Sequence, residues 1–110
     1  MPTLNTEGST LTDGTEQVLA TITANKYLQF SINLTPMASG DTLKVFVYKK
    51  VKSTGTLARF HVETYTDAET TDPESPVKDS GPFWSPNQFR VSIQRTAGTD
   101  RTYDWEILES

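Results

Sequence analysis

Residues 40–62 read GDTLKVFVYKKVKSTGTLARFHV and contain the clearest hairpin pattern in the chain. Apolar and polar residues alternate along both arms, as in half-buried strands whose successive side chains point to opposite faces. A turn at residues 54–55 predicts a register that places Val47 opposite Val62, so that apolar residues meet across the two strands. The hairpin therefore predicts a β-domain.

The same alternation recurs outside the hairpin, and no segment carries a helical period over three turns. Further strands are expected at residues 17–24, 27–34, 88–94 and 103–108, with one or two more in residues 1–16 and near Phe83. Short strands separated by turn residues predict an all-β fold, an antiparallel β-sandwich, with jelly-roll connectivity as one possible strand order.

The shared phase of alternation predicts a single core. Its expected members are Phe30, Ile32, Val45, Val47, Val62, Val91, Ile93 and Trp105. The indole N–H of Trp105 needs an acceptor if the ring is buried. A three-residue turn at residues 98–100 would pair Ile93 with Trp105, and a five-residue turn would shift the pairs by two.

The chain of 110 residues predicts one domain at residues 17–110, preceded by an extended N-terminal arm at residues 1–16. The arm is polar and contains two glycines, so it is either loosely attached or lies across a neighbouring subunit. It has neither the charged start nor the apolar stretch of a secretory signal.

Composition excludes several classes of function. A formal charge of −4 disfavours nucleic acid as a partner, because phosphate contacts need clustered Lys and Arg. No apolar run approaches the roughly 20 residues that span a bilayer, so no membrane partner is expected. The chain has no cysteine, which removes disulfides and thiolate metal sites.

The sequence also contains no pattern of catalytic residues. His61 is the only histidine, and it is interpreted as a strand residue stacked against Tyr48. No serine lies in a nucleophile elbow, and no glycine-rich phosphate loop is present. We therefore expect no enzymatic activity, no cofactor and no catalytic residue.

Residues 67–82, DAETTDPESPVKDSGP, form the one long irregular segment. Its acidic side chains either remain solvated or gather around Ca²⁺ through their oxygen atoms. The spacing matches no EF-hand loop, so no metal ligand is assigned.

Four apolar residues in the irregular segments are the candidate anchors for a partner. They are Leu4, Leu11, Phe83 and Trp84. The alternative for the adjacent pair, Phe83 and Trp84, is that the two rings fold back and close one end of the sandwich.

Three stretches, TEQVLA at residues 15–20, GDTLKVFVYKKV at residues 40–51 and QRTAGTDR at residues 94–101, carry a family resemblance. They resemble a group of small virion proteins encoded among the structural genes of tailed bacteriophages, over about residues 13–107. The resemblance implies a capsid decoration or cement protein that binds the major capsid protein or other virion proteins, as a homo-oligomer or in many copies on the particle. It implies a location in the virion, assembled in the host cytoplasm, and it transfers no functional residue.

Two other functions remain open from the sequence. One is a tail, fibre or baseplate module, and the other is a carbohydrate-binding sandwich that uses Trp84, Tyr48 or Phe46 as a sugar platform. An exposed flat row of aromatic rings would favour sugar binding.

Overall fold

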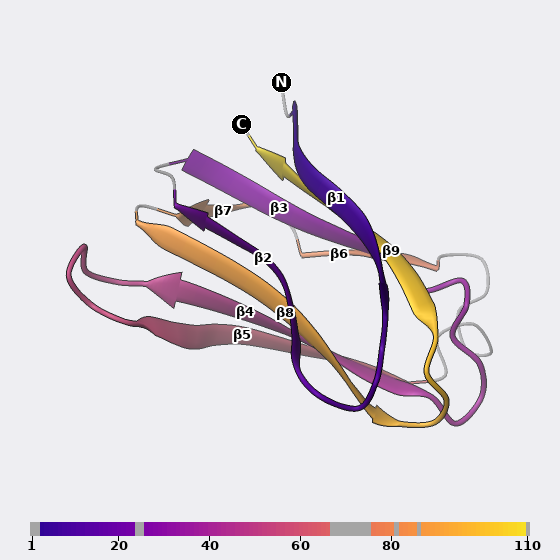
Figure 1. The fold of residues 1–110 in the computed structure, drawn as a ribbon. Coiled ribbons are helices and arrows are strands. Elements are labelled where there is room, and N and C mark those ends of the chain that lie inside the picture. Colours follow the sequence, from indigo (N-terminus) through magenta and orange to yellow (C-terminus); the bar gives the residue numbers. More distant parts are fainter. Residues whose placement is uncertain (1–2, 24–25, 67–75, 81, 86, 110) are drawn as a thin grey trace.

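The computed structural model describes residues 3–23, 26–66, 76–80, 82–85 and 87–109. These residues form nine β-strands and no helix, which confirms the all-β prediction (Figure 1). The strands are β1 (Thr3–Leu11), β2 (Gln17–Thr23), β3 (Lys26–Asn33), β4 (Thr42–Lys50), β5 (Leu57–Thr66), β6 (Val77–Asp79), β7 (Phe83–Ser85), β8 (Gln88–Ala97) and β9 (Thr102–Glu109).

The strands build two antiparallel sheets that pack together as a β-sandwich (Figure 1). Sheet A has the order β1-β9-β3-β6, and the short strand β7 also pairs with β3. Sheet B has the order β2-β8-β4-β5. The chain passes from one sheet to the other at each step from β1 to β4. This is the order of an eight-stranded jelly roll in which β6 and β7 together fill one strand position.

The core lies between the sheets and is built mainly from alternate residues of β3, β4, β8 and β9. It contains Leu28, Phe30, Ile32, Leu34, Met37, Leu43, Val45, Val47, Phe89, Val91, Ile93, Tyr103, Trp105 and Ile107. All the predicted core residues are present except Val62, whose side chain is 42% exposed. The alternation therefore predicted the buried face correctly on β3, β4, β8 and β9 and wrongly on β5.

The error on β5 comes from the hairpin register. Val47 lies opposite His61, whereas Val62 lies opposite Phe46 on the outer face of sheet B. The predicted pairing of Val47 with Val62 is wrong by one residue, and such a shift moves every side chain of the strand to the other face. Phe46 gives Val62 an apolar neighbour on the outer face, so the observed register also brings apolar side chains together.

A β-bulge interrupts the same hairpin. The register shifts after Val47, so that Tyr48 lies opposite Arg59. The guanidinium of Arg59 lies over the ring of Phe46 at 4.1 Å from its centroid, a cation–π contact that the bulge makes possible. The connecting turn is closed by the amide of Gly55, which donates to the carbonyl oxygen of Lys52.

The strands β8 and β9 do not form a hairpin. They lie in different sheets, so Ile93 and Trp105 meet across the core rather than side by side. Both predicted turn lengths are therefore wrong. The chain crosses between the sheets next to Gly98, whose φ of 89° is a left-handed conformation that suits glycine.

The N-terminal residues 3–11 are not an arm outside the sandwich, because they form the edge strand β1 and pair with β9. Two residues of β1 fit the strand to Trp105. A Cβ atom on Gly8 would lie 2.9 Å from Cζ2 of Trp105, so only glycine leaves room for the ring. Thr10 Oγ1 accepts the indole N–H at 3.0 Å, which supplies the acceptor that the sequence required.

Candidate binding face of sheet A

Three of the four predicted partner residues have described side chains, and all three are exposed. Leu4 and Leu11 lie on β1 and are 49% and 58% exposed, and Trp84 lies on β7 and is 43% exposed. Phe83 pairs through its backbone with Leu28, and its side chain lies outside the described part of the structure.

The three exposed anchors share the outer face of sheet A. Leu28, Phe30 and Ile32 of β3 point into the core, so the alternating residue Tyr27 points outward and Trp84 lies opposite it. The register likewise pairs Leu4 with outward-facing Leu108 on β9. The exposure of Leu4, Leu11 and Trp84 on one face agrees with the sequence analysis, and their role as anchors for a partner stays a prediction.

Tyr27 and Trp84 form an exposed aromatic pair at one end of this face. Their ring centroids are 4.9 Å apart and their planes cross at 65°, an edge-to-face contact. Both side chains remain more than two-fifths exposed. The crossed planes do not make the flat row of rings that a sugar platform would need.

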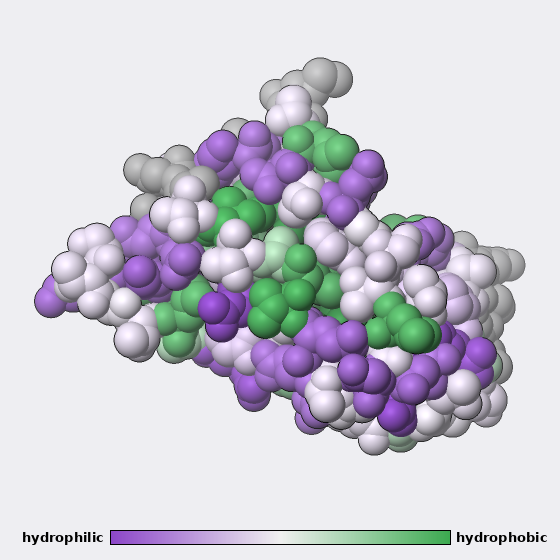
Figure 2. All heavy atoms as spheres, in the orientation of Figure 1, coloured by the Kyte–Doolittle hydropathy of each residue, from purple (hydrophilic) through white to green (hydrophobic). Residues whose placement is uncertain are grey.

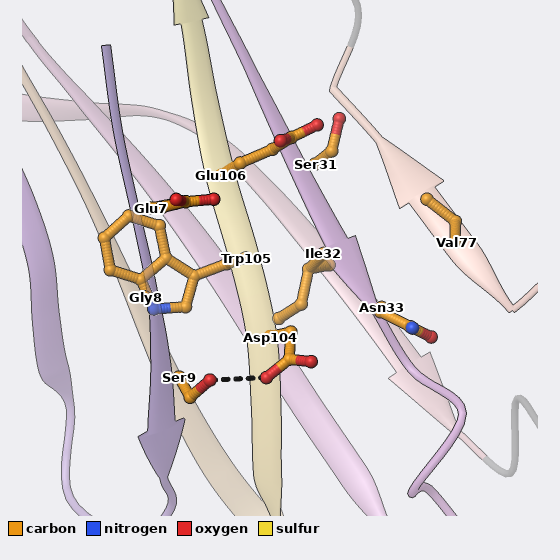
Figure 3. Close-up of a pocket in the computed structure, with 10 residues that line it drawn as sticks. All are labelled: Glu7, Gly8, Ser9, Ser31, Ile32, Asn33, Val77, Asp104, Trp105 and Glu106. Carbon is orange, nitrogen blue, oxygen red and sulfur yellow. Dashed lines mark hydrogen bonds between the residues drawn. The ribbon is translucent and has the colours of Figure 1, made fainter. Parts of the chain in front are cut away.

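A groove of about 420 Å³ occupies the middle of the face, between β1 and β6 (Figure 3). Outward side chains of β1, β9 and β3 lie along it, and Val77 of β6 forms one wall. Ser9 donates a hydrogen bond to the Asp104 carboxylate across the β1–β9 pair. The groove therefore combines polar side chains from three strands with apolar surface from Ile32, Val77 and Trp105.

The charge of the groove is negative. Glu7 lies directly opposite Glu106 in the β1–β9 register, and Asp104 is the next outward residue of β9. Asp79 lies beyond β3, where it accepts hydrogen bonds from Gln29 and Ser31. The described residues that line the groove include no Lys or Arg.

Sequence reasoning did not predict this groove. Its two facing glutamates come from strands about a hundred positions apart, and only the pairing of β1 with β9 brings them together. The usable signal was that polar residues, three of them acidic, stand at alternate positions in both segments, at Glu7 and Ser9 and at Asp104 and Glu106.

The outer face of sheet B is organised around Glu16. Its carboxylate accepts hydrogen bonds from Tyr48 Oη and Ser92 Oγ, and it lies 3.8 Å from the Arg59 guanidinium. Burial acts to raise the pKa of Glu16, but the hydrogen bonds and the nearby arginine outweigh it and lower the pKa. Phe46 lies beneath Arg59 and is only 4% exposed, so it cannot serve as a sugar platform.

His61 does not stack on Tyr48, because it lies opposite Val47, whereas Tyr48 lies opposite Arg59. Its Nε2 atom lies 3.1 Å from the carboxylate of Glu63 on the same strand, and both side chains are largely exposed. Within the described ranges, no three His, Cys, Asp or Glu residues are grouped as metal ligands. The predicted irregular segment, residues 67–82, is wrong in part, because Val77–Asp79 form strand β6. Residues 67–75, which contain most of the acidic side chains considered for Ca²⁺, lie outside the described residues.

The chain was compared with known protein families, curated proteins and solved structures, and no match was found in any of the three comparisons. In the part of the chain that the structure describes, no helix has the length and apolar character needed to cross a membrane.

Proposed function

We propose that this chain is a structural virion protein of a tailed bacteriophage, a capsid decoration or cement protein that binds the outer capsid surface and stabilises it. Its partners are the major capsid protein or other virion proteins, and many copies act together on one particle. The observation that supports docking through sheet A is a group of side chains on its outer face: Leu4, Tyr27, Trp84 and Leu108. The resemblance of residues 15–20, 40–51 and 94–101 supports the virion role.

The physical character of this face suits docking in many copies. Trp and Tyr contribute large contact areas at interfaces, and here they stand exposed without a covering element among the described strands. Figure 2 shows that apolar residues on the side in view form separate patches among hydrophilic residues. Small patches give modest affinity for a single contact, and repeated sites on one particle multiply that affinity.

The test measures how many copies bind to particles that lack the protein. Replacing Tyr27 and Trp84 by alanine is expected to weaken binding about tenfold or more, because exposed aromatic anchors carry much of the interface energy. Phe60→Ala is the matched control, since Phe60 is 46% exposed but lies on β5 of sheet B. Point substitutions are preferable to deletion of residues 1–14, because the deletion would remove β1 and leave the edge of β9 unpaired.

The measurement has two results that would overturn the proposal. If the double variant binds normally and Phe60→Ala weakens binding, docking uses sheet B near Phe46 and Tyr48. If the wild-type protein does not bind capsids at any concentration but is found on the tail by electron microscopy, the decoration role is replaced by a tail, fibre or baseplate role.

A second candidate function is carbohydrate binding at the host surface. The exposed pair of Tyr27 and Trp84 beside a groove with hydroxyl and carboxylate groups favours it, and the crossed ring planes disfavour it. Binding of glycans by the wild-type protein, lost in Trp84→Ala, would support this function over the decoration role.

A further inference from the structure

Two local groups of opposite charge lie on the two sheets of this protein. The groove on sheet A carries Glu7, Asp104 and Glu106. The hairpin of sheet B carries a basic run, Lys49-Lys50-Val51-Lys52, at the end of β4 and the start of the turn. The two features have opposite charge and lie on different sheets of the molecule.

The groove holds an unfavourable arrangement of charge. Glu7 and Glu106 are direct neighbours across β1 and β9, and like charges placed opposite each other destabilise a strand pair. Throughout the described ranges, neither carboxylate forms an ion pair with a basic side chain. A cationic group bound between them would relieve this repulsion and would be attracted by Asp104 as well.

The hairpin presents the complementary group in an accessible form. Val51 is 85% exposed, and the hydrogen bond from Gly55 to Lys52 holds the turn in a defined shape. Figure 1 shows the turn extending beyond the ends of β2 and β8 in the same sheet. Among the described residues, no carboxylate is within ion-pair distance of Lys49, Lys50 or Lys52.

We propose that the groove of one copy binds the β4–β5 hairpin of a second copy. Lysines 50 and 52 of the hairpin meet Glu7 and Glu106, and Val51 packs against Val77, which is 57% exposed at the groove wall. The groove volume of about 420 Å³ accommodates a few side chains, which matches a hairpin tip rather than a whole strand. A chain cannot place its own hairpin in its own groove, because the two lie on different sheets.

This contact joins two different surfaces, so it is heterologous. Each copy that receives a hairpin still offers its own hairpin, and the association continues until it closes as a ring or extends as a chain. Tyr27 lies on β3 four residues before Ser31, which lines the groove, and Trp84 of β7 lies opposite Tyr27. The aromatic pair therefore occupies another part of the face. The aromatic end therefore stays available, and the inference does not depend on the proposed virion role.

The experiment measures self-association of the purified full chain by sedimentation velocity at low and high salt. The wild-type protein is expected to associate at low salt and to dissociate as salt screens the exposed charges. Glu106→Lys and Lys52→Glu should each weaken association about tenfold or more, because each turns an attraction into a repulsion. The matched controls are Glu63→Lys and Lys44→Glu, which make the same charge changes on β5 and β4 away from the groove and the turn.

Mixing the two reversed variants gives the decisive result. Glu106→Lys and Lys52→Glu chains should associate with each other more strongly than either does alone, because each hairpin then finds an opposite charge in the other chain's groove. Melting curves confirm that every variant is folded. A wild-type protein that stays monomeric to about 1 mM at low salt, control variants that weaken association equally, or a mixture that fails to restore it would each overturn the inference. None of these results depends on whether the protein binds a capsid.

Discussion

Gly98 and Gly40 allow a steric contact to be separated from backbone strain. Both have left-handed φ angles, 89° and 90°, so alanine at either position meets a similar conformational penalty of about 1–2 kcal/mol. Their surroundings differ. A Cβ atom on Gly40 would meet nothing within 4 Å, whereas one on Gly98 would lie 2.1 Å from Asp41 Oδ1 and 2.6 Å from Asp41 Cα.

Asp41 makes this clash expensive. Its buried carboxylate accepts hydrogen bonds from the amides of Ala38 and Thr99, at 2.9 and 3.0 Å, and from Arg101 Nε. Hydrogen bonds to a charged group contribute about 1.5–3 kcal/mol each, and moving Asp41 away from Gly98 breaks at least those to Thr99 and Arg101. With the backbone term added, Gly98→Ala should lower the free energy of unfolding by about 4 kcal/mol or more.

Chemical denaturation of the two variants beside wild type measures this difference. Gly40→Ala should lose about 1–2 kcal/mol and Gly98→Ala more than twice as much, with a fall in Tm of roughly 15 °C or more. If the two variants lose equal stability, within about 0.5 kcal/mol, the argument is refuted. The clash between a Cβ atom at position 98 and Asp41 would then add nothing to the backbone penalty.

Three further predictions concern the core, the edge strand and pH. Val47→Asp should prevent folding because it buries an unpaired charge, whereas Val62→Asp should leave a cooperative melt near the wild-type temperature; a soluble, normally melting Val47→Asp protein would contradict the core. Gly8→Ala should destabilise the fold by about 1–3 kcal/mol by pressing on Trp105, and unchanged near-ultraviolet circular dichroism would argue against that contact. Burial acts to raise the pKa of Asp41, but its arginine and two amide donors hold the pKa below the ordinary 3.8. Its stabilisation is therefore present above pH 3.8 and is lost as the pH falls through the folded-state pKa; Asp41→Asn should flatten that part of the stability profile, and an unchanged profile would exclude the role.

Alternation predicted which residues are buried, but it could not tell strands that lie side by side from strands that face each other across the core. Ile93 and Trp105 illustrate this, because the same pattern suits a hairpin partner and a residue of the opposite sheet. The register of β5 was predicted wrongly because alternation suits two registers, one with Val62 opposite Val47 and one with Val62 opposite Phe46. The position of Arg59 over Phe46 is a tertiary contact that no local pattern in the sequence contains.

For the candidate site, the exposed apolar residues could be predicted from the sequence, but the groove could not. Leu4, Leu11 and Trp84 stood out as apolar residues in polar surroundings, and their exposure could be predicted from their immediate neighbours. The groove required a pairing between the first and the ninth strand, which only the complete fold specifies. The local sequence therefore predicted that these apolar residues are exposed, and the long-range strand pairing decided which surface they share.

The position of β9 between β1 and β3 has a consequence for synthesis of the chain. At the ribosome, β1 emerges first but has no partner in its sheet until β9 follows, since β1 pairs only with β9 among the described strands. The hydrogen bond between Thr10 and Trp105, 95 residues apart, can form only at that late stage. Sheet B contains β2, β4, β5 and β8, so it is complete before β9 is made. Sheet B can thus assemble before sheet A has received its inner strand β9. During that interval the apolar inner face of sheet B is exposed to chaperones or to neighbouring chains.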